Sequence, residues 1–359
     1  MAGAGKAIKV GLQGYGLSGR IFQRQLAQEA GMEVAAVVTR NENRRAQVKA
    51  ELPGARIYDT YAELLADSSI ELVVLGTPHD QHAPEAIAAA HAGKHCVVDK
   101  IMCLSAAEAD RMVAAAKANG VLLSVFHNRR WDGDYLTVQK AIADGLLGEI
   151  YSVECAVVGF GEPPVDPANV AWRARAEKGG GPLRDWGAHL MDQAVQLYGA
   201  EPEILLADLQ YLWPGITVEQ AATVVFRYPS GVRYRIEVGS ISLIRRPHWY
   251  VRGSKGSLLI EGIDPQEGFL KQGRVVGGTE EAQLPAANFR FESRVPGAQL
   301  EIVPGDYRQY YRNVRDAIRG EAELAVSGEQ VRSVMALYDR IFAAAQHAPW
   351  AKPVFGGRD

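Results

Sequence analysis

Short apolar runs alternate with amphipathic stretches over the first third of the chain. The segments Lys6–Val10 and Met32–Val38 are apolar enough for buried strands, and between them Ile21–Ala30 carries apolar residues at helical spacing. Two further runs, Glu71–Gly76 and His95–Val98, end at polar turns, as buried parallel strands do. This alternation predicts an α/β fold with a doubly wound parallel sheet.

The pattern becomes rich in β-branched and aromatic residues after about Asn128. We expect a helix at Tyr135–Asp144 and two closing helices at Tyr307–Ile318 and Glu329–Ala345. Turn residues separate the apolar runs between them, which predicts an open, mainly antiparallel sheet flanked by helices, an α+β arrangement. The expected domains are therefore residues 1–127 and 128–359. The expected strands are Glu149–Val158, Glu203–Tyr211, Ala221–Arg227, Val232–Ile241, His248–Val251 and Gly256–Glu261.

Composition supports this two-domain picture. A chain of 359 residues is long for one core, and 47% hydrophobic with 23% charged residues is typical of globular proteins. The net charge of −3 argues against a nucleic-acid partner, and neither a membrane span nor a secretory signal is found, so we expect a cytoplasmic protein. The three cysteines form no CxxC pair, so the sequence indicates neither a disulfide framework nor a metal site.

A glycine-rich turn follows the first predicted strand. Its three glycines have the Gly-x-Gly-x-x-Gly spacing, in which one makes a tight turn, one admits a pyrophosphate and one lets helix pack on strand. Such strings also occur in ordinary turns, but here strand, helix and second strand surround it. The sequence therefore predicts a dinucleotide site formed by Gly14, Tyr15, Gly16, Leu17, Ser18 and Gly19.

The second predicted strand ends where many such sites carry an acid that binds the ribose 2′-hydroxyl. This chain has Thr39 and Arg40 there, with Arg44 and Arg45 one turn further on. A guanidinium can bind a 2′-phosphate bidentately, which favours NADP over NAD as the cofactor. Two alternatives stay open, because enzymes that use both cofactors also lack the acid and Arg40 could be an ordinary solvated residue.

Polar residues follow the next two predicted strands. Ligands of doubly wound sheets bind beyond the carboxyl ends of the strands. That rule places Thr77, Pro78 and His82 after one strand, and Asp99 with Lys100 after the next, at the cofactor site. A lysine there can donate to a substrate hydroxyl or alkoxide, although a lone lysine is ordinarily solvated.

The densest polar cluster of the second half follows the glycine run 179–181. If the chain is helical from Asp185, then Asp185, His189 and Asp192 share one helix face. A carboxylate beside an imidazole suits a general acid/base that works near neutral pH. The alternative is an ordinary surface pair of a carboxylate and a histidine.

Lys100 and His189 together resemble the catalytic pair of one family. Over almost its full length the chain resembles the glucose-fructose oxidoreductase, inositol dehydrogenase and rhizopine-catabolism (Gfo/Idh/MocA) oxidoreductases. Asp99-Lys100-Ile101 stands at the family's Glu-Lys-Pro motif, with Ile101 in place of the proline, and Asp185 to His189 stands at its Asp-x-x-x-His motif. Four strings look like the NADP-preferring scyllo-inositol dehydrogenase branch: Gly14–Gly19, Phe126–Asp134, His189–Gln193 and Gly262–Glu267.

The resemblance implies an activity and further contacts. It implies an N-terminal Rossmann domain, a C-terminal sheet whose exposed face joins copies into a homo-oligomer, and reversible oxidation of a secondary hydroxyl on a polyol or sugar. His189 would take the proton, Lys100 would stabilise the alkoxide and Asp185 would orient the substrate or His189. Further contacts expected for cofactor or substrate are Trp172 and Arg173, in a run that departs slightly from the family's more proline-rich one, and Asn128, Arg129 and Trp131.

Several alternatives stay open. Arg129 and Arg130 could pair with acidic side chains instead of binding hydroxyls. Some relatives look like glycosidases that oxidise their substrate transiently and give no net redox change. A nonenzymatic dinucleotide-sensing regulator is the third possibility, slightly favoured by the altered Asp99-Lys100-Ile101 motif and opposed by the presence of Lys100, Asp185 and His189.

Overall fold

The computed structural model describes residues 6–162, 166 and 170–345. The chain forms two compact units that are not consecutive stretches of sequence. The first unit contains Met1–Trp131, Gln266–Gly278 and Asp306–Arg332, and the second contains Asp132–Pro265, Thr279–Gly305 and Ser333–Asp359. Two segments that lie late in the sequence thus belong to the unit that begins the chain.

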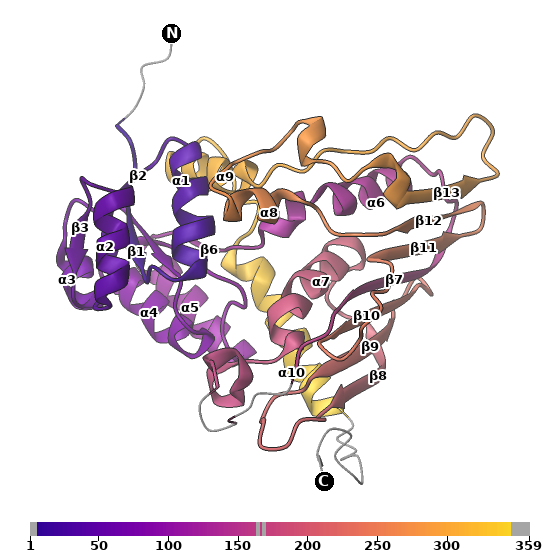
Figure 1. Ribbon diagram of the computed structural model, residues 1–359, viewed down its shortest axis with the longest axis horizontal. Helices are drawn as coiled ribbons and strands as arrows, with labels where there is room; N and C mark the ends of the chain where they lie inside the picture. The colour runs from indigo at the N-terminus through magenta and orange to yellow at the C-terminus, as the bar shows by residue number, and fades with distance from the viewer. Residues whose placement is uncertain (1–5, 163–165, 167–169, 346–359) are drawn as a thin grey trace. The chain divides into compact units, whose positions relative to one another are not determined.

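The first unit is built on a six-stranded sheet in which every pair is parallel (Figure 1). The strand order is β3-β2-β1-β4-β5-β6, so the predicted doubly wound sheet is confirmed. The order reverses between β1 and β4, which is where sheets of this kind bind ligands at their carboxyl ends. The strands are β1 Lys9–Gln13, β2 Glu33–Val38, β3 Arg56–Tyr58, β4 Leu72–Leu75, β5 His95–Val98 and β6 Leu123–Val125.

Strands β2, β4 and β5 are mostly apolar and buried, as expected in a parallel sheet whose two faces are covered by helices. Leu72–Leu75, for example, is buried at every position. The helix predicted at Ile21–Ala30 begins earlier than expected, as a π-helical turn that is followed by α1. Helices α4 and α5 pack side by side. The helical elements of this part are η1 Ser18–Gln23, α1 Arg24–Glu29, α2 Glu42–Glu51, α3 Tyr61–Ala66, α4 His79–His91, α5 Ala106–Ala118 and η2 Asn128–Trp131.

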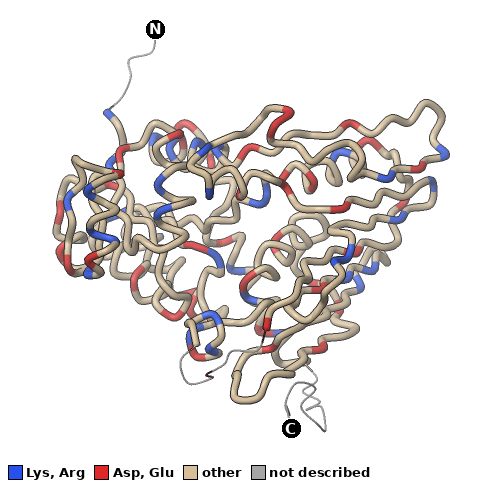
Figure 2. The backbone as a smooth tube through the Cα atoms, in the orientation of Figure 1, with Lys and Arg blue, Asp and Glu red and all other residues tan. Residues whose placement is uncertain are grey.

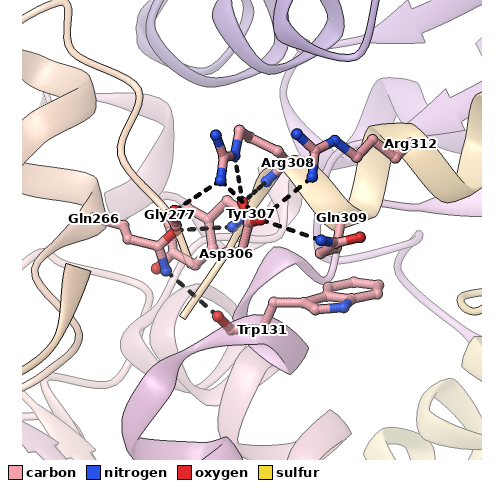
Figure 3. Close-up of polar contacts among 8 residues, drawn as sticks. All are labelled: Trp131, Gln266, Gly277, Asp306, Tyr307, Arg308, Gln309 and Arg312. Carbon is pink, nitrogen blue, oxygen red and sulfur yellow. Dashed lines mark hydrogen bonds and ion pairs between the residues drawn. The ribbon is translucent and has the colours of Figure 1, made fainter. Parts of the chain in front are cut away.

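The late segments of the first unit, α8 Gln266–Lys271 and α9 Arg308–Ile318, are tied to the end of η2 (Figure 3). The Gln266 amide donates to the Trp131 carbonyl at 3.4 Å and accepts from the main-chain nitrogen of Tyr307 at 2.8 Å. Beside it the Asp306 carboxylate pairs with Arg308 at 2.7 Å. These contacts fix α8 on the first unit.

The second unit contains a seven-stranded sheet in the order β13-β12-β11-β7-β10-β9-β8. The prediction of a mainly antiparallel sheet is confirmed, since β7 with β10 is the one parallel pair in the described part of this sheet. The strands are β7 Ile150–Val158, β8 Glu203–Gln210, β9 Ala221–Arg227, β10 Arg233–Gly239, β11 Trp249–Gly253, β12 Gly256–Ile260 and β13 Phe289–Ser293.

One face of this sheet packs on α7 Pro182–Tyr198, which lies against β10 and β9. Buried and partly exposed residues alternate along β10, as expected for a strand covered on one side. Figure 2 shows basic and acidic residues mixed along the described chain, and no described helix is long and apolar enough to cross a membrane. The remaining helices are α6 Gly133–Ala143, η4 Trp172–Ala174, η5 Ala176–Lys178, η6 Glu280–Ala282, η7 Ala286–Asn288 and α10 Gly328–Ala344.

A buried carboxylate joins α6 to the sheet. Asp134 is 1% exposed, and its two oxygens accept from Trp249 Nε1 at 3.2 Å and from the main-chain nitrogen of Asp264 at 2.8 Å. Asp264 in turn accepts from the main-chain nitrogen of Gly133 at 2.7 Å. Since every donor in this group is buried, losing the carboxylate leaves polar groups without water or partner.

We expect Asp134→Ala to lower the free energy of unfolding by about 3 kcal/mol, because two buried donors lose a charged acceptor. Urea unfolding followed by circular dichroism measures this. Asp144→Ala, at the end of the same helix, removes a half-exposed ion pair with Lys140 and should cost no more than about 0.5 kcal/mol. Equal losses in the two variants would contradict the role assigned to Asp134.

Candidate active site

The glycine turn has the geometry that a pyrophosphate site needs. Gly14 has a φ of 96°, and its nitrogen donates to the Val38 carbonyl at 3.3 Å. A Cβ on Gly19 would collide with the Gly14 carbonyl oxygen, so this glycine is needed for close packing. At Gly16 a Cβ would meet only the Arg44 guanidinium, 3.8 Å away, which leaves the main chain open to a ligand. The three glycines therefore fit a bound dinucleotide.

The side chains of this turn face in different directions. Tyr15 is buried and its hydroxyl donates to Glu51 of α2 at 2.7 Å. Burial, together with this hydrogen bond, raises the pKa of Tyr15. Leu17 is 54% exposed, and the Ser18 hydroxyl accepts from Gln23 at 3.2 Å. Tyr15 can thus offer a ligand only its main chain, while its ring braces the turn against α2.

The ribose end of the site contains an exposed pair of arginines. Thr39 is buried, whereas Arg40 and Arg44 are exposed, and neither guanidinium has an ion pair or side-chain hydrogen bond with a described residue. Arg45 differs, because it pairs with Asp59 at 2.5 Å and donates to the Thr39 carbonyl at 3.2 Å. Arg40 and Arg44 are therefore available to an anion, and Arg44 also lies in the first turn of α2, where the helix dipole favours negative charge.

The ends of β4 and β5 hold the other predicted cofactor residues. Pro78 caps α4, and the Thr77 hydroxyl donates to Glu85 at 2.6 Å. His82 has no exposed surface, and both of its ring nitrogens face main-chain carbonyls. Its ring therefore cannot reach a ligand directly, whereas the carbonyls it binds belong to loops at the cofactor end of the sheet.

Lys100 lies in the loop after β5 and is partly exposed. Its main-chain nitrogen donates to the Asp99 carboxylate at 2.8 Å, and the peptide bond that joins it to Ile101 is cis. Ile101 itself is buried at 1% exposure. The isoleucine that departs from the family motif is thus accommodated inside the first unit, with Lys100 at its surface.

Glu267 of α8 is a candidate site residue that the sequence did not single out. Its carboxylate pairs with Arg129 at 2.5 Å and with Lys271 at 2.7 Å, and Arg129 also donates to the Tyr307 hydroxyl at 3.1 Å. Burial would raise the pKa of Glu267. The neighbouring charges of Arg129, Lys271 and Lys100 outweigh burial, so this pKa lies below its ordinary value.

This ion pair gives Arg129 an acidic partner, and its role toward substrate stays a prediction. The guanidinium is 5% exposed and bonded to an acid, as the pairing alternative expects. Arg130 donates to the Ala325 carbonyl at 2.6 Å and to Gln330 at 3.0 Å. Asn128 is buried as well, whereas Trp131 keeps part of its surface exposed.

In the second unit, α7 places the predicted acid/base face. Glu219 is buried and accepts from the main-chain nitrogen of Leu183 at 2.9 Å, which holds the first turn of the helix. The segment from Asp185 is helical, so Asp185, His189 and Asp192 lie on one face as predicted. His189 is 6% exposed and its ring meets Trp186 edge-on, with centroids 6.1 Å apart.

A pocket of about 810 Å³ opens at the Asp185 end of this face, and His189 is not among the residues that line it. Asp185 and Trp186 line it, together with Arg173, whose guanidinium lies 3.9 Å from the Asp185 carboxylate and 4.5 Å above the Trp172 ring. The size fits a small polar molecule, and the charged lining suits hydroxyl groups. The other lining residues are 156–161, 181–182, 239–240, 245–248 and 261–263.

The predicted residues are thus divided between the two units. The first holds the glycine turn, Arg40, Arg44 and Lys100, and the second holds Asp185 and His189. Among the described residues no cluster of His, Cys, Asp and Glu could hold a metal ion, and the three cysteines are buried thiols. The first set can bind a dinucleotide and the second can move a proton.

Comparisons with known proteins cover almost the whole chain. Residues 8–127 match the oxidoreductase family with an NAD-binding Rossmann fold, and residues 135–259 match the GFO/IDH/MocA C-terminal domain. The chain is similar to scyllo-inositol 2-dehydrogenase (NADP(+)) of Bacillus subtilis, at 32% identity over 95% of this chain and 93% of that protein.

Two further relatives extend the comparison. An uncharacterised oxidoreductase of Escherichia coli is 35% identical over 95% of this chain and 97% of its own length. The solved structure of an oxidoreductase from Bacillus cereus has a TM-score of 0.81 at 26% identity and covers 94% of this chain and 96% of its own. With its glycine turn, its 3-2-1-4-5-6 parallel sheet and matches to both domains of the family, the chain belongs to the Gfo/Idh/MocA oxidoreductases.

Proposed function

We propose that the chain is an NADP-preferring enzyme that interconverts a secondary hydroxyl and a ketone on a polyol or sugar. The observation that carries this is the helix face of Asp185 and His189 on α7, where Asp185 lines a pocket with other charged residues, in a chain whose other unit has a dinucleotide turn. The similar Bacillus subtilis enzyme is named for an inositol substrate and for NADP(+), which supports the same class here.

The cofactor is held by the first unit in this proposal. The main chain of Gly14–Gly19 binds the pyrophosphate, and Arg40 and Arg44 bind the 2′-phosphate. Thr77, Pro78 and Asp99 contribute from the strand ends, and NAD remains a weaker second cofactor. Bound nicotinamide supplies or accepts a hydride at its C4 atom. The resemblance to the family makes Trp172 and Arg173 further candidates for contacts with nicotinamide or substrate.

The proton chemistry belongs to three side chains. In the oxidation, the His189 imidazole takes the hydroxyl proton while the hydride leaves the same carbon for the cofactor and the C=O bond forms. The Lys100 ammonium donates a hydrogen bond to the reacting oxygen and stabilises its alkoxide character. Asp185 orients the substrate or the imidazole.

The assembly and the domain roles complete the proposal. We assign nucleotide binding to the first unit, which contains Gln266–Gly278 and Asp306–Arg332 in addition to the expected residues 1–127, and substrate binding to the second unit. We assign the exposed face of the second unit's sheet to contacts between identical chains. Asn128, Arg129 and Trp131 are further candidates for contacts with substrate hydroxyls. We also propose a cytoplasmic location.

A substrate panel tests the function directly. scyllo-Inositol, myo-inositol and common aldoses, with their ketone counterparts, are offered with NADP(H) and NAD(H), and absorbance of the reduced nicotinamide is followed in both directions. We expect turnover with at least one polyol or sugar. Release of a sugar without net cofactor change would instead indicate a glycosidase, and firm NADPH binding without any turnover would indicate a sensor.

His189→Ala and Lys100→Ala should each lower kcat/KM for the active substrate by about a hundredfold to ten-thousandfold. The first variant loses the imidazole that takes the proton, and the second loses the hydrogen-bond donor to the reacting oxygen. The Kd for NADPH should stay within about threefold, since neither loss touches the phosphate contacts. Lys117→Ala, an exposed lysine on α5, is the matched control and should leave both constants unchanged. Unchanged kcat/KM in both site variants would refute the assignment.

Arg44→Gln should weaken NADPH binding about tenfold to a hundredfold, because a charged hydrogen bond to phosphate contributes roughly 1.5–3 kcal/mol. NADH binding should change by less than about threefold, since NADH has no 2′-phosphate. Fluorescence titration measures both. Lys49→Gln removes the same charge from the same helix at an exposed position and controls for net charge. Equal losses of both cofactors would overturn the proposed preference, and Arg40→Asp tests it independently in the same way.

A further inference from the structure

His82 in the first turn of α4 is a fully enclosed imidazole with two carbonyl partners. Nδ1 lies 2.8 Å from the Ile101 carbonyl oxygen, and Nε2 lies 3.0 Å from the Thr77 carbonyl oxygen. Main-chain carbonyls only accept hydrogen bonds, so the ring must be the donor in whichever bond forms. With 0% exposure, the side chain serves neither solvent nor a ligand.

The two partners lie in different loops at the same end of the sheet. Thr77 follows β4, and Ile101 follows β5, which is the neighbouring strand. A neutral imidazole carries one N–H, so it donates to only one of these carbonyls, and the shorter contact is the one from Nδ1 to Ile101. The ring thus lies between two loops that the sequence predicted at the cofactor site. Strand pairing ends before these residues, so the sheet itself does not fix their relative positions.

Glu85, one turn further along α4, connects the end of β1 to the loop that follows β4. Its carboxylate accepts from Gln13 at the end of β1 and from the Thr77 hydroxyl, both at 2.6 Å. Gln13, Glu85, Thr77, His82 and Ile101 thus form a line of polar contacts across the ends of β1, β4 and β5. The line ends at the residue after Lys100.

We propose that His82 is a positioning residue that sets the place of the Lys100 ammonium through its bond to the Ile101 carbonyl. The inference rests on the proposed role of Lys100 in the reaction. The main chain of Lys100 is held on its other side by Asp99, whose carboxylate accepts from the Lys100 nitrogen at 2.8 Å. Because the residues on both sides are held, the Cα of Lys100 has a defined position from which its side chain extends.

Two substitutions distinguish the contact of the ring with Ile101 from its contact with Thr77. His82→Gln places an amide nitrogen near the position of Nε2 and keeps a donor for Thr77, whereas His82→Asn places one near Nδ1 and keeps a donor for Ile101. Both remove the imidazole and both leave a small void. A purely structural role predicts equal effects, while a positioning role predicts that losing the Ile101 bond is worse for catalysis.

We expect His82→Gln to lower kcat about a hundredfold, since a shift of about 1 Å in a catalytic group has that effect. His82→Asn should restore kcat about tenfold relative to His82→Gln, while KM and the Kd for NADPH stay within about threefold in both. The midpoint temperature of thermal unfolding should fall by similar amounts in the two variants. His91→Gln, an exposed histidine at the end of the same helix, is the control and should match the unchanged protein.

Hydrogen exchange of the main-chain amides of residues 100–104 gives a readout that needs no turnover. Exchange should be faster in His82→Gln than in His82→Asn, and faster exchange in both to the same degree would overturn the inference. Equal kcat in the two variants, with an active unchanged protein, would overturn it as well. If the unchanged protein oxidises nothing in the panel, the proposed function fails, and the exchange rates still decide whether His82 holds this loop.

Discussion

Parallel strands that are buried on both faces bring all their carboxyl ends to one edge of the sheet, and the first unit depends on this constraint. At this edge the chain leaves each strand, and the residues that follow are no longer held by hydrogen bonds between strands. At β1 these residues are held by the glycine turn, through the positive φ of Gly14 and the close approach of Gly14 and Gly19. At β4 and β5 they are held by side chains of α4, through His82 and Glu85. Each arrangement leaves main chain or cationic groups facing outward from the edge.

Features that depend on neighbouring residues could be predicted from the sequence. The glycine spacing, the apolar strands and the Asp185 to His189 helix face are local patterns, and the structure has each of them. The start of the first helix was predicted too late, because a glycine at position 19 gives little helical signal although the π-helical turn includes it. Within the described part of the second sheet, the one parallel pair joins β7 to β10, a pairing that no local pattern specifies.

Features that depend on distant residues could not be predicted. Glu267 stands 138 residues from Arg129, and only the packing of α8 on the first unit makes them partners. The same holds for the arginines near the ribose end. Arg44 and Arg45 are adjacent and chemically identical, yet Asp59 occupies one and leaves the other available. The sequence alone gives no reason to choose between them, because the deciding carboxylate is reached only through the fold.

The tie between Tyr15 and Glu51 has a consequence for how cofactor preference can change. Glu51 ends α2, the helix whose first turn carries Arg44, and it also pairs with Arg20 of the turn that follows the glycines. The helix that carries Arg44 is thereby held against the glycine turn. In the proposed function the turn binds the pyrophosphate and Arg44 the 2′-phosphate, so a shift of α2 would alter both proposed contacts together. A substitution at position 44 would alter only the proposed contact with the 2′-phosphate.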